Sequence, residues 1–397
     1  MSVLDHPAPI EGPGSPVAPA LARLALLFLG VLIGLLAFDR GLAWIDSWRD
    51  LSDAGQLMPD SELAWTNRPG FKSERASINS LGLRGPELPA VPPADEIRIL
   101  GTGASTTFGA GDGGPLDDQT WAASLQRGIA QASGGRSDVR VLNGGVNGYS
   151  VIQAARRALL LLPEVEPDLV LVFVSPGSQA LMDVSATRSS VPIDGVPVPA
   201  DIVNDTPRLL LPAAVVAHKA LLSWSALYKR WRLQATDSGR RPPEIDRFVI
   251  SRSRHRPVID PFLERTWAEL AALGQACDER GIELRALLVP EYFMDAEGPW
   301  RDYLAEYGTL GAPPVGTARR EPIDVLEEQL AAHGIESWSM YEALNVIGTD
   351  HAKYTGDGRH WTPAGHDVIA MALLQHLRRE NLLETLRQRR AADPRSP

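Results

Sequence analysis

A serine, an aspartate and a histidine stand in short polar segments of this sequence, where side chains are available for chemistry. Ser105 lies in the small-residue segment 101–109, GTGASTTFG, and Asp357 stands three residues before His360 in the segment DGRH. A serine hydroxyl becomes a strong nucleophile when a nearby base such as an imidazole takes its proton. The three residue types therefore indicate covalent catalysis on a carbonyl group, with Ser105 as the attacking residue.

Two further segments contain groups that can hold the negative oxygen formed in such an attack. Residues 143–149, NGGVNGY, contain glycines that allow backbone N–H groups to approach a substrate closely. Residues 175–179 end in Gln179, whose side-chain amide is a donor. Each of these groups alone usually has a structural role, and it is their joint occurrence that favours a catalytic site.

These distant segments require a framework that brings them together. Apolar runs suited to strands of a buried parallel sheet alternate with helical patterns and lie at 97–102, 139–144, 168–175, 283–290 and, more weakly, 334–338. A last helix is expected from Thr362 and Pro363 to about Arg379. The alternation predicts a three-layer α/β/α sandwich around a mainly five-stranded parallel sheet. In such sheets ligands bind at the carboxyl ends of the strands, and all four polar segments follow an expected strand.

Composition argues against several other classes of function. The net charge of −10 argues against binding to nucleic acid, which requires clustered lysine and arginine. The single cysteine, Cys277, forms no internal disulfide and is expected on the buried face of a helix. The sequence has no His-Glu-x-x-His pair or carboxylate cluster for a metal, and the loop of Ser105 has no lysine for a nucleotide phosphate. We expect neither a metal nor another cofactor.

Over about residues 59–379 the chain resembles the GDSL/SGNH hydrolase family. The resemblance rests on the blocks GASTTFG, GGVNGYS and DGRH, and on the segment INSLGLRGP that begins at Ile78. It implies a flavodoxin-like SGNH fold. It also implies Ser105 as the nucleophile, His360 as the base and Asp357 as the acid that orients this base.

The resemblance further implies an oxyanion hole, which departs from the family pattern. The implied donors are the backbone N–H groups of Ser105 and Gly148 and the amide of Gln179. Gln179 stands where the family has an asparagine, so its amide lies one methylene further out. Loss of one such donor lowers turnover by about a hundred- to a thousandfold. Ala104 replaces the aspartate of the family name and leaves the serine intact.

Two other histidines are less suited to the role of base. Asp350 and His351 form a competing acid and base pair, but they lack the family spacing. His366 is expected to cap or pack the last helix.

The N-terminal region predicts a membrane attachment. Residues 1–20 are rich in proline and glycine and are expected to be a flexible tail, and an uncharged run follows at 24–38. A span requires about 20 apolar residues, so an uncleaved anchor over 21–40 competes with a cleaved signal peptide and with a buried helix of a soluble domain. The lack of an A-x-A-like cleavage site favours the anchor. We expect a single-pass protein of the bacterial cytoplasmic membrane, with its catalytic domain facing the periplasm or the cell exterior.

The rest of the chain divides into three regions. Residues 41–95 are expected to be a juxtamembrane lead-in, residues 96–380 the hydrolase domain and residues 381–397 a C-terminal tail. An insertion at 184–257 is a surface loop, a lid or a partner surface. Within it the segment LLSWSALYKRWRL, residues 221–233, predicts an amphipathic helix that packs in the core or lies on a membrane.

Three classes of function agree with these observations. The favoured one is a serine esterase that acts on acyl or acetyl esters of an extracytoplasmic glycan or lipid, or on a small-molecule ester. The second is a polysaccharide O-acyltransferase that passes the same acyl group to a sugar hydroxyl. The third is a catalytically silent glycan-binding or assembly module, suggested by Ala104 and Gln179.

Overall fold

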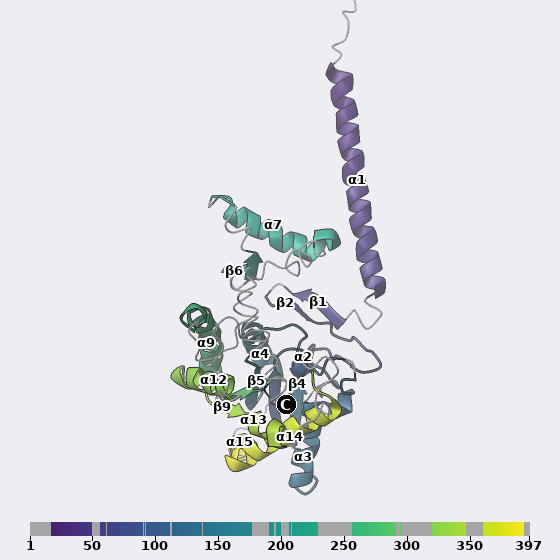
Figure 1. The fold of residues 1–397 in the computed structure, drawn as a ribbon. Coiled ribbons are helices and arrows are strands. Elements are labelled where there is room, and N and C mark those ends of the chain that lie inside the picture. Colours follow the sequence, from purple (N-terminus) through teal and green to yellow (C-terminus); the bar gives the residue numbers. More distant parts are fainter. Residues whose placement is uncertain are drawn as a thin grey trace, which may run out of the picture.

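The centre of the molecule is a five-stranded parallel sheet (Figure 1). The computed structural model describes residues 17–49, 56–60, 62–89, 91, 93–111, 113–136, 138–176, 190–193, 196–199, 206–207, 209–228, 256–290, 294, 320–346 and 360–392. In spatial order the strands of the sheet are β4 (Val139–Asn143), β3 (Ile97–Thr102), β5 (Leu169–Val174), β8 (Glu283–Leu288) and β9 (Ser337–Ser339). Every neighbouring pair is parallel. The predicted sheet is confirmed, and its order is that of flavodoxin-like doubly wound folds.

Both faces of the sheet are covered by helices, as β5 shows most clearly. Its side chains alternate between two hydrophobic cores because successive residues of a strand point to opposite faces: Val170 and Val172 lie in one core, and Leu171 and Phe173 in the other. The first core is closed by α4 (Val151–Val165), α9 (Arg256–Asp278) and α12 (Glu321–Ala332). The second is closed by α3 (Trp121–Ala132), α13 (Tyr341–Val346), α14 (Pro363–Arg379) and α15 (Leu382–Ala392). The three-layer sandwich is confirmed.

Two expectations about single residues are met on these helices. The hydroxyl of Thr362 accepts a hydrogen bond from the backbone N–H of Gly365 at 3.3 Å, and Pro363 occupies the first turn of α14. The helix therefore starts where its capping residues predict. Cys277 is fully buried in α9, where burial raises the pKa of its thiol to about 12.

The C-terminal tail expected over 381–397 is wrong for its first part, which forms α15. The chain turns at Asn381, which has φ +51°, and then packs Leu382 and Leu386 into the second core. The guanidinium of Arg387 also pairs with Asp138 at 2.8 Å. The sequence after Arg379 is short and highly charged, so the apolar face of α15 is too small to stand out as a pattern.

A long helix, α1 (Val17–Arg49), precedes the domain. It begins inside the expected flexible tail, with Pro19 in its first turn, where proline is tolerated, and it continues past the expected end of the anchor. Its stretch Arg23–Leu42 is long and apolar enough to cross a membrane. The apolar side chains of this stretch are exposed, Phe28 for example to 73%, which argues against the buried helix of a soluble domain.

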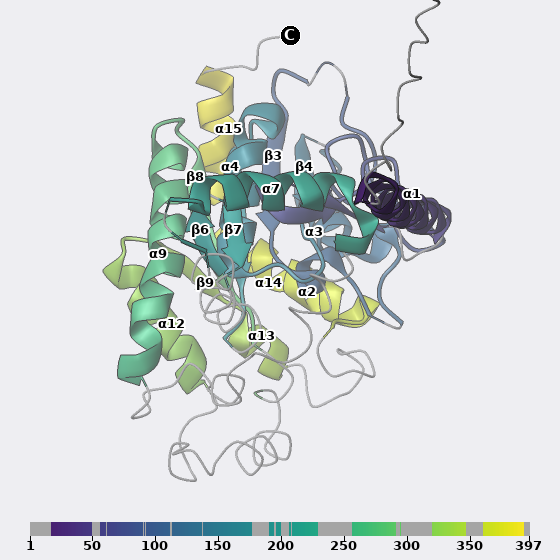
Figure 2. The same ribbon diagram turned by 90° about the horizontal axis from the view of Figure 1, so that it is seen from above.

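Two hairpins lie on the side of the sheet domain that faces α1 (Figure 1). In the lead-in, β1 (Leu57–Asp60) pairs antiparallel with β2 (Ala64–Asn67). In the expected insertion, β6 (Ser190–Ile193) pairs antiparallel with β7 (Val196–Pro199). Viewed from above, α7 (Leu211–Trp224) runs across the top of the domain and ends beside α1 (Figure 2).

The single helix predicted over 221–233 is interrupted at Ser225. The helix α7 ends at Trp224, and Ser225 is extended, with φ −101° and ψ 117°. The carboxylate of Asp39 in α1 accepts hydrogen bonds from the Ser225 hydroxyl and from the backbone N–H of Leu227. This tertiary contact separates α7 from a second helical turn that begins at Ala226. Residues 229–233 lie outside the described part.

Candidate active site

Ser105 stands at the start of a short helix directly after β3. This helix, α2 (Ser105–Phe108), follows the strand after two residues, and the side chain of Ser105 is partly exposed. The turn is tight: a Cβ on Gly103 would lie 2.1 Å from Oγ1 of Thr107. Because the first N–H groups of a helix have no partner within it, the backbone N–H of Ser105 belongs to a group of donors suited to an external oxygen.

The loop after β4 packs directly against this turn. The N–H of Gly144 donates to the carbonyl oxygen of Gly101 at 2.7 Å, and that of Val146 to Gly103 at 3.0 Å. A Cβ on Gly145 would lie 2.3 Å from the backbone nitrogen of Phe108, so only glycine fits there. The two predicted loops therefore lie side by side at the carboxyl ends of neighbouring strands.

Gly148 is the implied second donor and has a backbone conformation that favours glycine, with φ +79°. Its loop is held from outside by the lead-in. The indole N–H of Trp65 donates to the carbonyl oxygen of Asn147 at 2.9 Å, and the hydroxyl of Tyr149 donates to the carbonyl oxygen of Trp65 at 2.7 Å. A Cβ on Gly148 would lie 3.3 Å from the Trp65 ring. The peptide that contains the implied donor is thus fixed by contacts with β2.

Two buried polar side chains support the inner side of the same loop. Arg157 of α4 donates to the carbonyl oxygens of Gly144 at 3.0 Å and of Gly82 at 2.8 Å. The amide of Asn67 donates to the carbonyl oxygens of Gly145 at 2.9 Å and of Gly82 at 3.1 Å. These bonds join the lead-in to the loop and satisfy backbone carbonyls that burial would otherwise leave unpaired.

Arg84 supports the other end of α2. Its guanidinium donates to the carbonyl oxygens of Phe108 at 2.9 Å and of Gly109 at 3.0 Å, and it pairs with Asp117 at 2.9 Å, beside the single turn Asp117–Gln119. The backbone N–H of Arg84 also donates to the carbonyl oxygen of Asn143 at the end of β4. One lead-in residue therefore fixes both loops.

His360, the predicted base, is partly exposed and directly precedes a buried anchor, Trp361. The rings of Trp361 and Phe173 lie 6.4 Å apart, and those of Phe173 and Trp121 lie 4.8 Å apart. The indole N–H of Trp121 donates to the carbonyl oxygen of Thr107 in α2 at 2.8 Å. A continuous row of aromatic side chains thus connects the segment of His360 with the helix of Ser105.

His366 has the packing role expected for it. It is fully buried in α14, and its Nδ1 accepts a hydrogen bond from the backbone N–H of Trp121 at 3.0 Å. Burial, with a smaller contribution from the charge of Arg84, lowers the pKa of His366 to about 3. A neutral imidazole held in this way supports the fold and is not available as a base.

The structure thus brings the loops of Ser105 and Gly148 together. Asp357 and Gln179 lie outside the described residues, as do Asp350 and His351. The pairing of His360 with Ser105 therefore stays a prediction, and so does the role of Asp357.

Sequence reasoning missed the residues that support these loops. Trp65, Asn67 and Arg84 belong to the lead-in, and the only signal for them was the resemblance of the segment that begins at Ile78. Arg157 is surrounded by buried Ala154, Ala158 and Leu161 on one face of α4. A charged residue on an apolar helix face was the available signal for its function.

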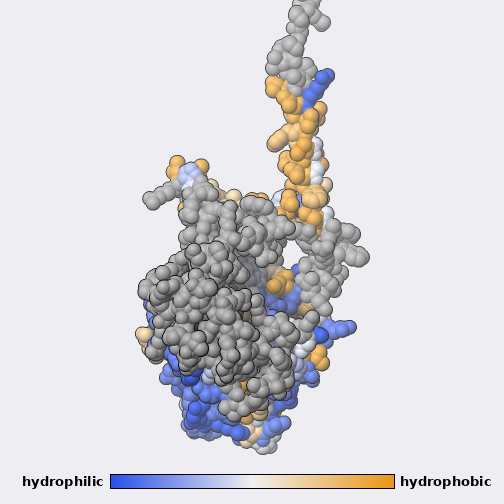
Figure 3. Space-filling view, in the orientation of Figure 1, coloured by the Kyte–Doolittle hydropathy of each residue, from blue (hydrophilic) through white to orange (hydrophobic). Residues whose placement is uncertain are grey.

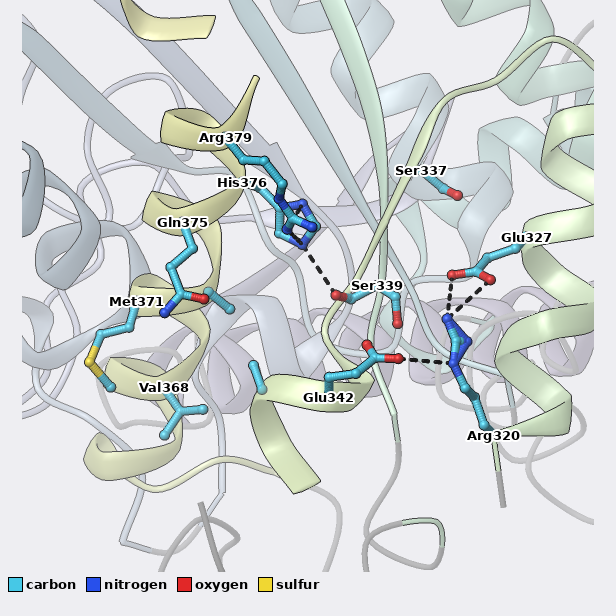
Figure 4. Close-up of a pocket in the computed structure, with 12 residues that line it drawn as sticks. Arg320, Glu327, Ser337, Ser339, Glu342, Val368, Met371, Gln375, His376 and Arg379 are labelled. Carbon is cyan, nitrogen blue, oxygen red and sulfur yellow. Dashed lines mark hydrogen bonds and ion pairs between the residues drawn. The ribbon is translucent and has the colours of Figure 1, made fainter. Parts of the chain in front are cut away.

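A pocket of about 850 Å³ opens at the edge of the sheet beside β9, and none of the predicted site residues lines it (Figure 4). Its charged groups largely pair with one another: Arg320 binds Glu327 at 3.1 Å and Glu342 at 2.9 Å. His376 stacks on Trp338 and lies 3.3 Å from the carbonyl oxygen of Ser339. The lining residues are Arg320, Glu327, Ser337, Ser339, Glu342, Ala343, Val368, Met371, Ala372, Gln375, His376 and Arg379. This balanced charge gives no indication of a particular ligand.

Comparison with solved structures gives matches of low overall similarity. TesA is 14% identical with a TM-score of 0.36, over 70% of this chain and 97% of TesA. A lipase/acylhydrolase from Enterococcus faecalis is 16% identical with a TM-score of 0.36, over 71% and 95%. A catalytic mutant of the acetylxylan esterase Axe2 from Geobacillus stearothermophilus is 16% identical with a TM-score of 0.34, over 72% and 95%. No protein-family model and no curated protein matches the chain. TM-scores this low do not define a fold, so the fold described above rests on the order and register of the strands.

Proposed function

We propose that this protein is a membrane-anchored serine esterase of the GDSL/SGNH type. The observation that carries the proposal is the direct packing of the loop of Gly148 against the turn of Ser105, through the hydrogen bond from Val146 to Gly103. A nucleophile and a backbone donor on neighbouring strand ends are what acyl transfer through a serine requires.

In the proposed mechanism the Ser105 hydroxyl attacks the carbonyl carbon of an ester while the imidazole of His360 takes its proton. The negative oxygen is held by the backbone N–H groups of Ser105 and Gly148 and by the amide of Gln179. The C–O bond to the alcohol then breaks, and the alcohol leaves with the proton from His360. Water repeats the sequence on the acyl-enzyme and releases the acid. Asp357 fixes the tautomer of the imidazole and stabilises its charged form.

The proposed location of this reaction is the outer side of the bacterial cytoplasmic membrane. The helix α1 supports an anchor, since its exposed apolar stretch Arg23–Leu42 has the length of a span. A substrate attached to a glycan or a lipid at the membrane surface fits an enzyme held there.

The proposal is tested with the full-length protein in detergent and an aryl acetate as substrate. Ser105→Ala should lower turnover by about ten-thousandfold or more. The matched control is Ser124→Ala, which removes a surface hydroxyl bonded to Asp367 and should leave the rate unchanged. A fluorophosphonate should label Ser105 in the wild-type protein, as located by mass spectrometry. Equal rates in wild-type and Ser105→Ala protein would overturn the proposal.

The acyl acceptor is determined in the same assay by adding an oligosaccharide. An esterase releases free acid at a rate that the sugar does not change. The appearance of an acylated sugar that depends on Ser105 would instead identify an O-acyltransferase with the same acyl-enzyme.

A further inference from the structure

Exposed large apolar side chains are concentrated in one part of the described sheet domain. Apart from α1, the exposed examples at Val91, Leu116, Leu159, Leu160 and Met371 are scattered. Six others belong to residues 209–228, here called the α7 segment: Leu209, Leu210, Val216, Leu221, Trp224 and Leu227. Contiguous apolar surface of this kind on a protein marks a site of interaction.

The exposed face of α7 is apolar along its length. Val215 and His218 point inward and are 4% and 3% exposed. The opposite face contains Val216, Leu221 and Trp224, exposed to 66%, 38% and 53%. A surface helix of a soluble protein has polar residues on its outer face, so this face is unsuited to contact with water alone.

The α7 segment is joined to α1 by a defined set of contacts. Asp39 is 5% exposed and accepts hydrogen bonds from the Ser225 hydroxyl at 2.7 Å and the Leu227 N–H at 2.8 Å. The next residue, Arg40, donates to the carbonyl oxygen of Trp224, and its guanidinium lies 4.4 Å from the centre of the Trp224 ring. These contacts fix the end of α7 at one level along α1.

That level lies near the C-terminal end of the candidate span Arg23–Leu42 of α1. Asp39 and Arg40 directly follow the uncharged run that ends at Phe38. Arginine and tryptophan are favoured at the boundary between lipid and water, so the Arg40 and Trp224 pair marks this boundary. From there α7 runs crosswise to α1, which is the direction of the membrane plane (Figures 1 and 2). Figure 3 shows hydrophobic side chains on α1 and again at α7, above a hydrophilic lower part of the molecule.

We propose that the α7 segment lies in the lipid surface of the membrane that α1 crosses, with its apolar face inserted between the headgroups. The inference rests on the proposed anchoring by α1. Helices of this kind insert by about 5–10 Å at the boundary of headgroups and acyl chains. On the inner side of the segment, a hydrogen bond of 2.6 Å between His218 and the Tyr228 hydroxyl joins α7 to the residues that follow it. Together α1 and α7 hold the sheet domain against the bilayer at two places.

The test uses the full chain in phosphatidylcholine and phosphatidylglycerol vesicles, with an environment-sensitive fluorophore on a single introduced cysteine. The native Cys277 is fully buried, so labelling of the folded protein is directed to the new site. The test variant is Val216→Cys. Leu29→Cys in α1 reports on the anchor, and Met371→Cys, an exposed apolar position on α14, serves as the matched control.

We expect the probe at position 216 to show a blue-shifted emission, loss of quenching by aqueous iodide and quenching by a nitroxide lipid. The probe at position 371 should be quenched by iodide and not by the lipid. If position 29 is quenched by the lipid while position 216 behaves like position 371, the α7 proposal is overturned and the anchor stands. Protection of position 216 from iodide without quenching by the lipid also overturns it, in favour of a protein partner. If position 29 is not quenched by the lipid, the anchor itself fails.

Discussion

The indole of Trp65 donates a hydrogen bond of 2.9 Å to the carbonyl oxygen of Asn147, which shares a peptide unit with the N–H of Gly148. In a trans peptide the C=O and N–H groups point in opposite directions. The bond from Trp65 therefore orients the N–H of Gly148 away from β2. Trp65, which lies 82 positions before Asn147 in the sequence, thus orients one of the proposed oxyanion donors.

Trp65→Phe should consequently slow the chemical step. The loss of one hydrogen bond, about 0.5–1.5 kcal/mol, frees the peptide to rotate and should lower kcat for an aryl acetate by up to about tenfold with little change in KM. Trp338→Phe is the matched control, since it removes the indole bond to Glu380 beside β9, and should leave kcat unchanged. Equal effects of the two substitutions would contradict a positioning role for Trp65.

Comparing Gly148→Ala with Gly334→Ala should distinguish the effect of backbone strain on stability from a role of Gly148 in catalysis. A left-handed backbone at an alanine costs about 1–2 kcal/mol, and the new Cβ would lie 3.3 Å from the Trp65 ring. Gly334→Ala is the matched control: Gly334 has φ +72°, so the substitution imposes the same backbone strain, but the new Cβ would have no neighbouring atom within 4 Å. We expect both variants to lose similar thermal stability, but only Gly148→Ala to lose activity, by about a hundredfold. Steady-state kinetics and thermal melts check this, and full activity of Gly148→Ala would remove Gly148 from the oxyanion hole.

Arg157→Met should lower the free energy of unfolding by about 2–3 kcal/mol, because it leaves the buried carbonyl oxygen of Gly144 without its side-chain donor and removes one of the two side-chain donors to Gly82, the other being Asn67. The neighbouring Arg156 pairs with Glu269 at 2.5 Å where both side chains are partly exposed, so Arg156→Met should lower it by less than about 1 kcal/mol. Urea unfolding in detergent measures both. A smaller loss for Arg157→Met than for Arg156→Met would show that the loop does not depend on this support.

His366 should make the stability of the fold depend on pH. Its pKa in the folded protein is lowered to about 3, so between about pH 6.5 and 3 the unfolded chain binds a proton that the folded chain does not. The free energy of unfolding should therefore fall as the pH falls through this window, with a contribution of up to about 1.4 kcal/mol per pH unit.

The substitution His366→Asn should weaken this dependence, since asparagine can accept the hydrogen bond from Trp121 and does not titrate. Val368→Ala, at a buried site on the same helix, controls for lost packing and should lower stability equally at every pH. Parallel curves of unfolding free energy against pH for wild-type and His366→Asn protein would refute the assignment.

The parts of the fold that the sequence predicted depend on local patterns. The strand 97–102 and the helix that begins at Pro363 were placed correctly, because continuous apolar runs and capping residues act over a few positions. The end of α7 at Trp224 was not predicted, since it depends on Asp39, which lies 186 residues before Ser225. For the same reason α15 was missed: its helix is stabilised by contacts such as Arg387 with Asp138.

The candidate site divides in the same way. Ser105, Gly148 and His360 are candidates that short sequence motifs indicate, and their roles stay predictions. The roles of Trp65 and Arg157 could not be predicted in this way. Each side chain donates hydrogen bonds to backbone carbonyl oxygens that are distant in the sequence, and such contacts produce no recognisable sequence motif.

The lead-in connects the anchor helix α1 to the sheet domain and also forms part of the candidate site, because its side chains hold the loop of Gly148. A soluble fragment cut at the start of β3 would keep Ser105, Gly148 and His360 but lose Trp65 and Asn67. Such a fragment would lose not only the anchor but also the hydrogen bonds from Trp65 and Asn67 that hold the loop of Gly148. An exchange of the anchor in an engineered protein should therefore be made upstream of β1, so that the hairpin of β1 and β2 stays with the sheet domain.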